Sequence, residues 1–399
     1  MRRVLATVVI GALLAVGLSG CLERRLVEGI EDELTQGAFY EVPADLPPGE
    51  PGEIVRSESI LEAPTGARAW RVLYHSTDQS GADIVVSGTV IVPDLPAPAD
   101  GRVIVSWAHP TTGSAAKCAP SLGAAPFSGI EGMDDLLLAG FAIAATDYPG
   151  MGVEGSSSYL LGIPESNAVL DAARAARNLE GTDAGDRLLL WGHSQGGHAA
   201  LFAAQRASEY APELTLEGVA VAAPAANLNA LMTDDIIDSS GVTIASYAIP
   251  AFTAAYADQY SKESMAAILT PAGAAAVDEI ASYCLLTEHP QIAKIADPLV
   301  GGFVTSDPAT TEPWATVLRE NSAGGAPIGV PIFVGQGLAD KLVVPSATEG
   351  YVAGLCAAGE TVQFEKFNGI THALAALASL PSLLGWFEGV LRGDSESDC

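Results

Sequence analysis

The pattern of apolar and polar positions switches between two periods along most of the chain. Short, continuously apolar runs are typical of strands that are buried on both faces of a sheet. Between these runs, apolar residues recur at helical spacing. The runs that predict buried strands are residues 103–107, 141–145 and 187–191. Further strands are predicted at residues 216–222, 331–334 and 361–367. The helices predicted with them are residues 165–179, 196–207, 346–357 and 372–391. Strands that alternate with helices predict right-handed crossovers and a mostly parallel sheet, which is the α/β class.

Two parts of the chain depart from this alternation. Residues 69–75 and 83–92 read as an antiparallel pair that opens the sheet. From 225 to 327 the chain is rich in alanine and helical in pattern, with no convincing strand. We therefore expect a core of two parts, 55–224 and 328–399, with a helical cap or lid inserted at 225–327.

The first twenty residues read as a leader rather than as part of the fold. Arg2 and Arg3 precede an apolar run that is short for a bilayer span, and small residues follow it. This order predicts a signal peptide over 1–20. Cys21 directly after the small residues resembles the lipobox of bacterial lipoproteins, whose cysteine is lipidated; the alternative is an ordinary signal peptide with Cys21 incidental. We expect a chain exported to the outer side of the cell envelope and held there by acyl chains, or secreted.

Residues 21–54 are charged and then rich in proline and glycine, which predicts a spacer. No later stretch reads as a membrane span, so a lipid anchor is the only membrane attachment expected.

The net charge limits the partners of the exported chain. It is −29 for the full sequence, and loss of Arg2 and Arg3 makes it −29 − 2 = −31. Such a surface repels nucleic acid and anionic lipid headgroups, so we expect neither as a partner. We expect a monomer. The acidic surface is informative about the medium around the protein, such as one of high salt that screens the carboxylates, and not about the reaction at the site.

The cysteines predict disulfides and not a metal site. With Cys21 set aside, Cys118, Cys284, Cys356 and Cys399 remain, an even number for an oxidising compartment. Of the three possible pairings we favour Cys118 with Cys284, which would fasten a lid to the core, and Cys356 with Cys399, which would fasten the tail. The chain has no CxxC or HExxH spacing, so we expect no metal and no cofactor.

The strongest candidate for chemistry is the run GHSQG at 192–196. Its central Ser194 follows a predicted buried strand and opens a predicted helix, which is the context of the nucleophile elbow in α/β hydrolases. Gly192 and Gly196 leave room for a strained strand-to-helix turn. The serine would then lie at a helix start, where free N–H groups stabilise a developing anion.

A serine nucleophile requires a base and an orienting carboxylate, in the chain order serine, acid, histidine. Only His289 and His372 lie well downstream of Ser194, and His289 falls within the expected cap. His372 follows the last predicted strand and is the expected base. Asp340, in the loop after the preceding strand, is the expected acid. Asp340 as a turn or helix-capping residue is the alternative, and Asp297 and Asp307 lie in or near the cap.

Two backbone donors are expected to form an oxyanion hole. One is the N–H of Gln195. The other belongs to the loop after the strand 103–107, where Pro110 has no N–H, which leaves Thr111 or Thr112. His109 is expected to shape this loop through hydrogen bonds, and His193 and His198 are expected to pack or to line the pocket.

Together these segments resemble the bacterial branch of the secretory lipase family, relatives of Candida lipase A. The resemblance rests on residues 107–113, 118–121 and 145–148, the elbow, and the late aspartate and histidine, and it spans about 55–392. It implies an α/β-hydrolase fold with a helical lid, disulfides near the lid, and a triacylglycerol lipase or carboxylesterase acting on acylglycerols or similar esters. Pro110 stands where a familiar form of the family's loop has glycine. The alternatives are a serine peptidase or polyester depolymerase, and a lipid-anchored binding protein without catalysis.

Overall fold

The computed structural model describes residues 37–235 and 238–399. The chain forms two units, Met1–Leu46 and Pro47–Cys399, and every labelled strand and helix belongs to the second unit. The expected signal peptide, Cys21 and residues 21–36 of the expected spacer lie outside the described residues.

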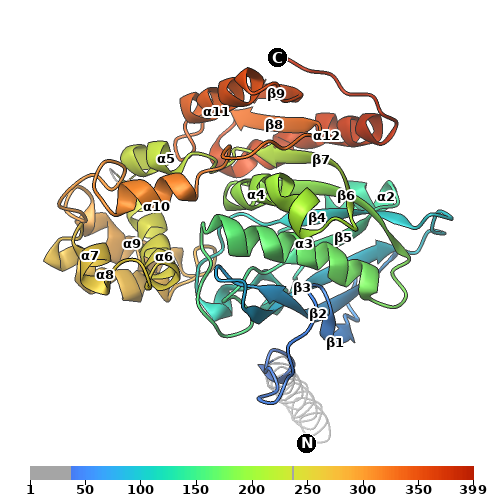
Figure 1. Ribbon diagram of the computed structural model, residues 1–399, viewed down its shortest axis with the longest axis horizontal. Coiled ribbons are helices and arrows are strands. Elements are labelled where there is room, and N and C mark those ends of the chain that lie inside the picture. The colour runs from blue at the N-terminus through green and yellow to red at the C-terminus, as the bar shows by residue number, and fades with distance from the viewer. Residues whose placement is uncertain (1–36, 236–237) are drawn as a thin grey trace, which may run out of the picture. The chain divides into compact units, whose positions relative to one another are not determined.

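Nine strands form one sheet in the order β1-β2-β3-β5-β4-β6-β7-β8-β9 (Figure 1). The strands are β1 (Ile54–Ser59), β2 (Ala67–Thr77), β3 (Asp83–Pro93), β4 (Arg102–Ala108), β5 (Ala142–Thr146), β6 (Ala184–His193), β7 (Thr215–Ala222), β8 (Ile332–Gly337) and β9 (Val362–Phe367). The pairs from β1 to β5 are antiparallel, and those from β5 to β9 are parallel. The mostly parallel sheet and its antiparallel opening pair are therefore confirmed.

The central strands are apolar on both faces, which is why their sequences read as continuous runs. In β6, Leu188 and Leu190 join the core on one face of the sheet, whereas Leu189 and Trp191 join the core on the other. The edge strand β1 was not predicted. It carries polar side chains that are partly exposed, so its sequence lacks an apolar run.

Helices cover both faces of the sheet. The core on one face includes residues of α3 (Gly162–Asn178), α4 (Gln195–Tyr210) and α11 (Pro345–Ala357). The core on the other face includes residues of α2 (Met133–Leu138) and α12 (Ala375–Leu391). The predicted helices are present, and the short α2 was missed.

One helix, His372–Leu391, is long and apolar enough to span a membrane by length and composition, contrary to the expectation from the sequence. Its Leu383, Trp386 and Phe387 are buried in the core beneath the sheet. Since core helices pass the same test, this finding is weak evidence for a membrane span.

Between β7 and β8 the chain leaves the sheet and forms the helices α5 to α10, which gather beyond one end of the strands in Figure 1. They are α5 (Leu228–Asp235), α6 (Ser239–Ala255), α7 (Lys262–Ala266), α8 (Pro271–Ala281), α9 (His289–Ala296) and α10 (Trp314–Glu320). We call the segment from α5 to α10, with its loops, the cap. The described cap contains only an isolated bridge, Leu269 with Val304, and no longer strand pairing. The aromatic contacts of Phe252 with Tyr256 and Trp314 form part of its own core.

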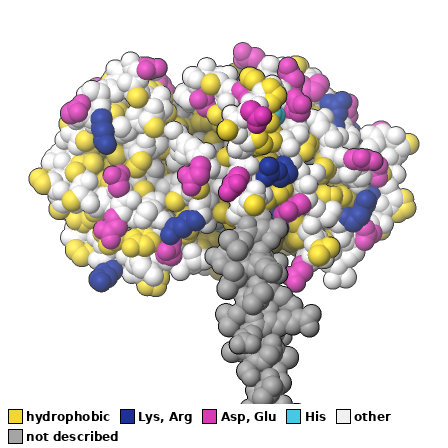
Figure 2. Space-filling model, turned by 90° about the horizontal axis from the view of Figure 1, so that it is seen from below, with side chains coloured by type: hydrophobic (Ala, Val, Ile, Leu, Met, Phe, Trp, Pro, Cys, Tyr) yellow, Lys and Arg dark blue, Asp and Glu magenta, His cyan; other side chains and the backbone are white. Residues whose placement is uncertain are grey.

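Two disulfides join distant parts of the chain. Cys118 is bonded to Cys284 in the cap, and Cys356 in α11 is bonded to Cys399. These are the pairs that the sequence analysis favoured. On the face shown in Figure 2, carboxylates are scattered among neutral and apolar side chains, and the basic side chains stand singly.

Candidate active site

Ser194 lies on a strained turn between β6 and α4. Its φ of 57° and ψ of −116° belong to a conformation that non-glycine residues rarely adopt. A β-carbon at Gly192 would lie 2.2 Å from the carbonyl oxygen of Gly196, and one at Gly196 would lie 1.8 Å from that of Ala108. The two glycines are therefore required by close backbone contacts, as the elbow motif predicts.

The structure brings Ser194, His372 and Asp340 together in one chain of hydrogen bonds. The Nε2 atom of His372 lies 2.8 Å from the Oγ of Ser194, and its Nδ1 lies 2.8 Å from the Oδ2 of Asp340. Both distances are those of good hydrogen bonds. Asp340 follows β8 and His372 follows β9, the neighbouring strand, so adjacent parallel strands deliver the two side chains to the same edge.

The carboxylate of Asp340 is held by its surroundings. Its side chain is fully buried. Its Oδ1 accepts hydrogen bonds from the backbone N–H of Leu342 (2.9 Å) and of Val343 (3.0 Å). The amide of Gln336 reaches Oδ2 at 3.3 Å. These donors fix the orientation of the carboxylate toward the imidazole.

A second histidine supports the loop that carries His372. The Nε2 of His193 lies 3.1 Å from the carbonyl oxygen of His372, and its Nδ1 lies 3.1 Å from the Oε2 of Glu131. The rings of His193 and His372 also pack, with centroids 5.2 Å apart. From the sequence, His193 was expected to pack or to line the pocket, and Glu131 was not expected at the site. No local signal links Glu131 to the elbow, because 62 residues separate it from His193.

The loop after β4 passes directly over the elbow, since the carbonyl oxygens of Ala108 and His109 face Gly196. Thr111 lines the same pocket as Ser194 and Gln195, and its Oγ1 lies 2.8 Å from the hydroxyl of Tyr159. Thr112 points elsewhere, because its Oγ1 donates to the carbonyl oxygen of Cys118 at 2.9 Å and it lines a different cavity. Of the two threonines, the structure places Thr111 beside the candidate nucleophile.

His109 is buried and serves the shape of this loop. Its Nδ1 lies 2.7 Å from the carbonyl oxygen of Pro110, its ring packs on Tyr148, and the hydroxyl of Tyr148 donates to its carbonyl oxygen. Burial lowers the pKa of His109, which favours the neutral ring. Asp147 is buried nearby, and burial raises its pKa. Its Oδ1 accepts from the N–H of Ser121 at 2.9 Å.

Behind the elbow lies a carboxyl group that the sequence analysis did not single out. Glu165 is fully buried in the first turn of α3, and burial raises its pKa. Its Oε1 accepts from the side-chain amide of Gln195 (2.6 Å) and from the N–H of Leu160 (3.1 Å). Its Oε2 lies 3.4 Å from the Nδ1 of His198, whose Nε2 lies 2.8 Å from the carbonyl oxygen of Asn321. An acidic residue on the apolar face of a predicted helix was the available signal.

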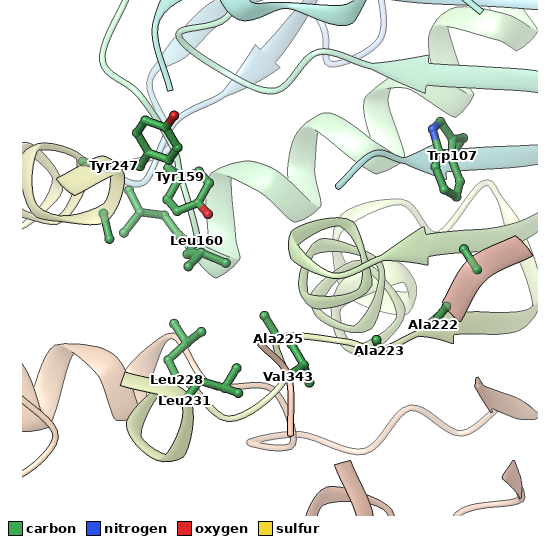
Figure 3. Packing of buried hydrophobic residues seen from close by; sticks show 14 of the residues in the cluster. Trp107, Tyr159, Leu160, Ala222, Ala223, Ala225, Leu228, Leu231, Tyr247 and Val343 are labelled. Atoms are coloured by element: carbon green, nitrogen blue, oxygen red, sulfur yellow. The ribbon is translucent and has the colours of Figure 1, made fainter. Parts of the chain in front are cut away.

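The pocket at Ser194, which we call the Ser194 pocket, is narrow and apolar. Its volume is about 40 Å³, and Ser194 itself is 7% exposed. In Figure 3, Tyr159 and Leu160 face Leu228 and Leu231 of the cap across this space. Figure 3 also shows Ala225 and Val343 beside it, whereas Trp107 lies well apart. The cap therefore covers the candidate nucleophile.

Several candidates from the sequence lie away from this site. His289 begins α9, and Asp297 begins a short 3₁₀ helix after it. The Oδ1 of Asp307 accepts from the N–H of Ala309 in a cap loop. Among the described residues, no group of three or more His, Cys, Asp or Glu is placed to hold a metal ion.

Relatives of this chain are lipases and esterases. Lipase 6 of Candida albicans is 26% identical over 397 residues, which cover 90% of this chain and 82% of that protein. A Mycobacterium tuberculosis protein named Probable inactive lipase is 25% identical, with 90% of this chain and 83% of that protein covered.

Solved structures share the fold. The structure of Candida antarctica lipase A in its closed state matches with a TM-score of 0.74 at 21% identity, covering 90% of this chain and 86% of that chain. This likeness confirms the α/β-hydrolase fold. The secretory lipase family model matches residues 131–398, a segment that begins at Glu131 and contains Ser194, Asp340 and His372. The chain therefore belongs to the secretory lipase family.

Proposed function

We propose that this chain is a serine hydrolase that cleaves carboxylic esters of lipid-like molecules through an acyl-enzyme, with Ser194 as the nucleophile. The observation that carries the proposal is the chain of two 2.8 Å hydrogen bonds from Ser194 through His372 to Asp340. Membership of the secretory lipase family supports ester hydrolysis as the reaction.

In the first step His372 Nε2 takes the proton from the Oγ of Ser194 as that oxygen attacks the ester carbonyl. Asp340 stays ionised, accepts the Nδ1–H of the imidazole and stabilises the imidazolium. His372 then gives the proton to the leaving alcohol, and the acyl group remains on Ser194. A water molecule, deprotonated by the same imidazole, attacks the acyl-enzyme and releases the carboxylic acid.

We assign the oxyanion hole to the backbone N–H groups of Gln195 and Thr111. Gln195 is the first residue of α4, and the first N–H groups of a helix have no partner within it. Thr111 supports the assignment because it lines the Ser194 pocket, whereas Thr112 does not. Loss of one such donor lowers kcat by about 10²–10³ in other serine hydrolases.

The substrate that fits this site has an apolar acyl part. The described side chains at the Ser194 pocket are largely aliphatic, including Leu160, Leu231 and Met232. A volume of about 40 Å³ is far below the ~300–1,000 Å³ of small-molecule sites, so α5 and α6 of the cap must move before a chain enters. We propose that the cap acts as this lid, and that the enzyme works as a monomer without metal or cofactor.

The test is hydrolysis of p-nitrophenyl esters of increasing chain length. We expect Ser194→Ala to lower kcat by about 10⁶ and Asp340→Asn by about 10⁴, with both variants folded. An alkyl phosphonate should add its mass to Ser194 and to no other residue. Absence of turnover by the wild type would instead group the chain with its inactive relative, and turnover by Ser194→Ala would exclude the nucleophile. Preference for emulsified triacylglycerol over short soluble esters would assign lipase activity.

The disulfides and the family fit an extracellular protein. We propose further that Cys21 carries the acyl chains that hold it at the envelope. Its support is the order of the leader, with small residues directly before the cysteine. Cys21→Ser should release the chain from the membrane fraction and abolish incorporation of labelled palmitate. Retention of both would refute lipidation at this residue.

A further inference from the structure

A second cavity lies on the far side of the loop that follows β4. Its volume is about 330 Å³, against about 40 Å³ for the Ser194 pocket, and it falls at the lower end of the ~300–1,000 Å³ range of small-molecule sites. Trp107, Ile130 and the disulfide of Cys118 with Cys284 contribute to its wall. Neither Ser194, Gln195 nor His372 does, so this cavity is separate from the proposed catalytic site.

The loop that follows β4 separates the two cavities. His109, Pro110 and Thr112 line the second cavity, whereas Thr111 lines the Ser194 pocket. A molecule in the second cavity therefore contacts the loop to which we assign an oxyanion donor. In Figure 3, Trp107 lies well away from the side chains that surround the Ser194 pocket.

The wall of the second cavity favours hydrocarbon over water. Among its buried polar side chains, those of His109, Ser121, Thr146 and Asp147 already have partners inside the protein. Asp147 accepts from Ser87 at 2.6 Å and from Ser121, and Thr112 donates to the carbonyl oxygen of Cys118. Since water needs two to four polar partners to occupy a cavity stably, walls of this kind suit an apolar occupant.

The entrance carries a different chemistry. Lys117 lines the cavity and its side chain is 53% exposed. Its Nζ donates to Glu288 Oε2 at 2.7 Å, which uses one of the three N–H donors of the ammonium group. Leu286, also on the lining, is 73% exposed and extends the apolar surface to the rim. In a chain with 48 acidic and 19 basic residues, a cation at an apolar opening suits an anionic head group.

We propose that this second cavity is a binding site for a single-chain amphiphile with a carboxylate head, a medium-chain fatty acid anion. The chain lies along Trp107 and Ile130, and the carboxylate lies at the entrance near Lys117. The volume of about 330 Å³ accommodates one chain of medium length. Such a ligand has the chemistry of the acid that ester hydrolysis releases, but the binding itself does not depend on the proposed catalysis.

The site can be tested by fluorescence quenching in the Ser194→Ala variant, in which no turnover is expected. The probe is 11-bromoundecanoate, whose terminal bromine quenches tryptophan on contact, and undecanoate is the control without bromine. Trp107 lines the second cavity, whereas the lining of the Ser194 pocket contains no tryptophan. We expect saturable quenching by the brominated acid below its micelle concentration. No saturable quenching would overturn the proposal.

Two substitutions locate the ligand. Gly129 lines the second cavity and a β-carbon there meets nothing within 4 Å, so Gly129→Phe should obstruct it and weaken binding at least tenfold. Gly325→Phe is the matched control, since Gly325 has equal space outside both cavities. Unchanged quenching in a folded Gly129→Phe protein would overturn the proposal.

Lys117→Met tests the head group and leaves the apolar wall intact. We expect it to weaken the brominated acid about two- to fivefold, the size of an exposed ion pair, and to leave 11-bromoundecanol unaffected. If the wild type binds the acid and the alcohol equally well, and Lys117→Met changes neither affinity, the assignment of a carboxylate ligand is overturned. The Lys117→Met measurement identifies the head group of the ligand even if Gly129→Phe fails to fold.

Discussion

The surroundings of the buried Glu165 carboxyl group predict its protonation state. The Nε2 of His198 faces the carbonyl oxygen of Asn321 at 2.8 Å, so this nitrogen carries a hydrogen. Burial raises the pKa of Glu165, which favours its neutral form. We therefore expect a protonated Glu165 whose Oε2–H donates to the Nδ1 of His198.

A glutamine at position 165 reproduces that pattern of donors and acceptors. Its oxygen accepts from Gln195 and from the N–H of Leu160, and its amide donates to His198. We expect Glu165→Gln to lower the free energy of unfolding by less than about 1 kcal/mol. Glu165→Ala leaves three buried groups without their partner, at about 1–3 kcal/mol each, so we expect a loss of at least about 3 kcal/mol.

Urea unfolding at pH 7 measures both values, with hydrolysis of a p-nitrophenyl ester as the second readout. Because Glu165 holds the side chain of Gln195, kcat should fall in Glu165→Ala and stay close to wild type in Glu165→Gln. Glu209→Gln, at an exposed position of α4, is the matched control and should stay within about 0.5 kcal/mol. If Glu165→Gln destabilises the protein as much as Glu165→Ala, Glu165 is ionised and the reasoning is refuted.

Three further predictions concern stability. Burial raises the pKa of Asp171 to about 6 from 3.8, so the folded state holds its proton more tightly and wild-type stability falls as the pH rises from about 4 to about 6. Over that pH range the free energy of unfolding of Asp171→Asn should rise by up to about 3 kcal/mol relative to that of the wild type. Urea unfolding measures this difference, and a difference that does not change with pH would contradict the prediction. A β-carbon at Gly196 would lie 1.8 Å from the carbonyl oxygen of Ala108, so Gly196→Ala should cost about 3 kcal/mol and most of the esterase activity; a stable, active variant would exclude the steric argument. Replacing Cys356 and Cys399 together by serine frees a 43-residue loop and should lower the free energy of unfolding by up to about 4 kcal/mol, whereas an unchanged melting temperature would show that the bond contributes nothing.

The central sheet could be predicted because its strands are buried on both faces. A run such as Leu188 to Trp191 is apolar at every position, and its short length favours a buried strand over a buried helix. The edge strand β1 lacks that signal, because each of its residues is partly or fully exposed to solvent. The short α2 also escaped prediction, since six residues are too few to show a helical period.

The candidate site could be predicted where chain order and loop position constrain the residues. Ser194, Asp340 and His372 each follow a predicted strand, so their meeting required only a parallel sheet. Thr111 and Thr112 could not be separated, because consecutive residues of an irregular loop face different ways for reasons of tertiary packing. Glu131 and Glu165 support the site through contacts that depend on the folded chain. The local sequence shows at most that Glu165 lies on the apolar face of a helix, and it does not show which groups either residue contacts.

The disulfide of Cys118 with Cys284 makes the loop after β4 depend on the compartment in which the chain folds. The bond spans 166 residues, and beside it the carbonyl oxygen of Thr112 accepts from the N–H of Leu285 in the cap. In a reducing cytoplasm the two cysteines stay reduced and unbonded, so the loop beside Ser194 lacks its covalent tie to the cap. If the chain is exported as we propose, we expect oxidation outside the cytoplasm to supply this restraint, so that the loop gains its covalent tie to the cap only in an oxidising compartment.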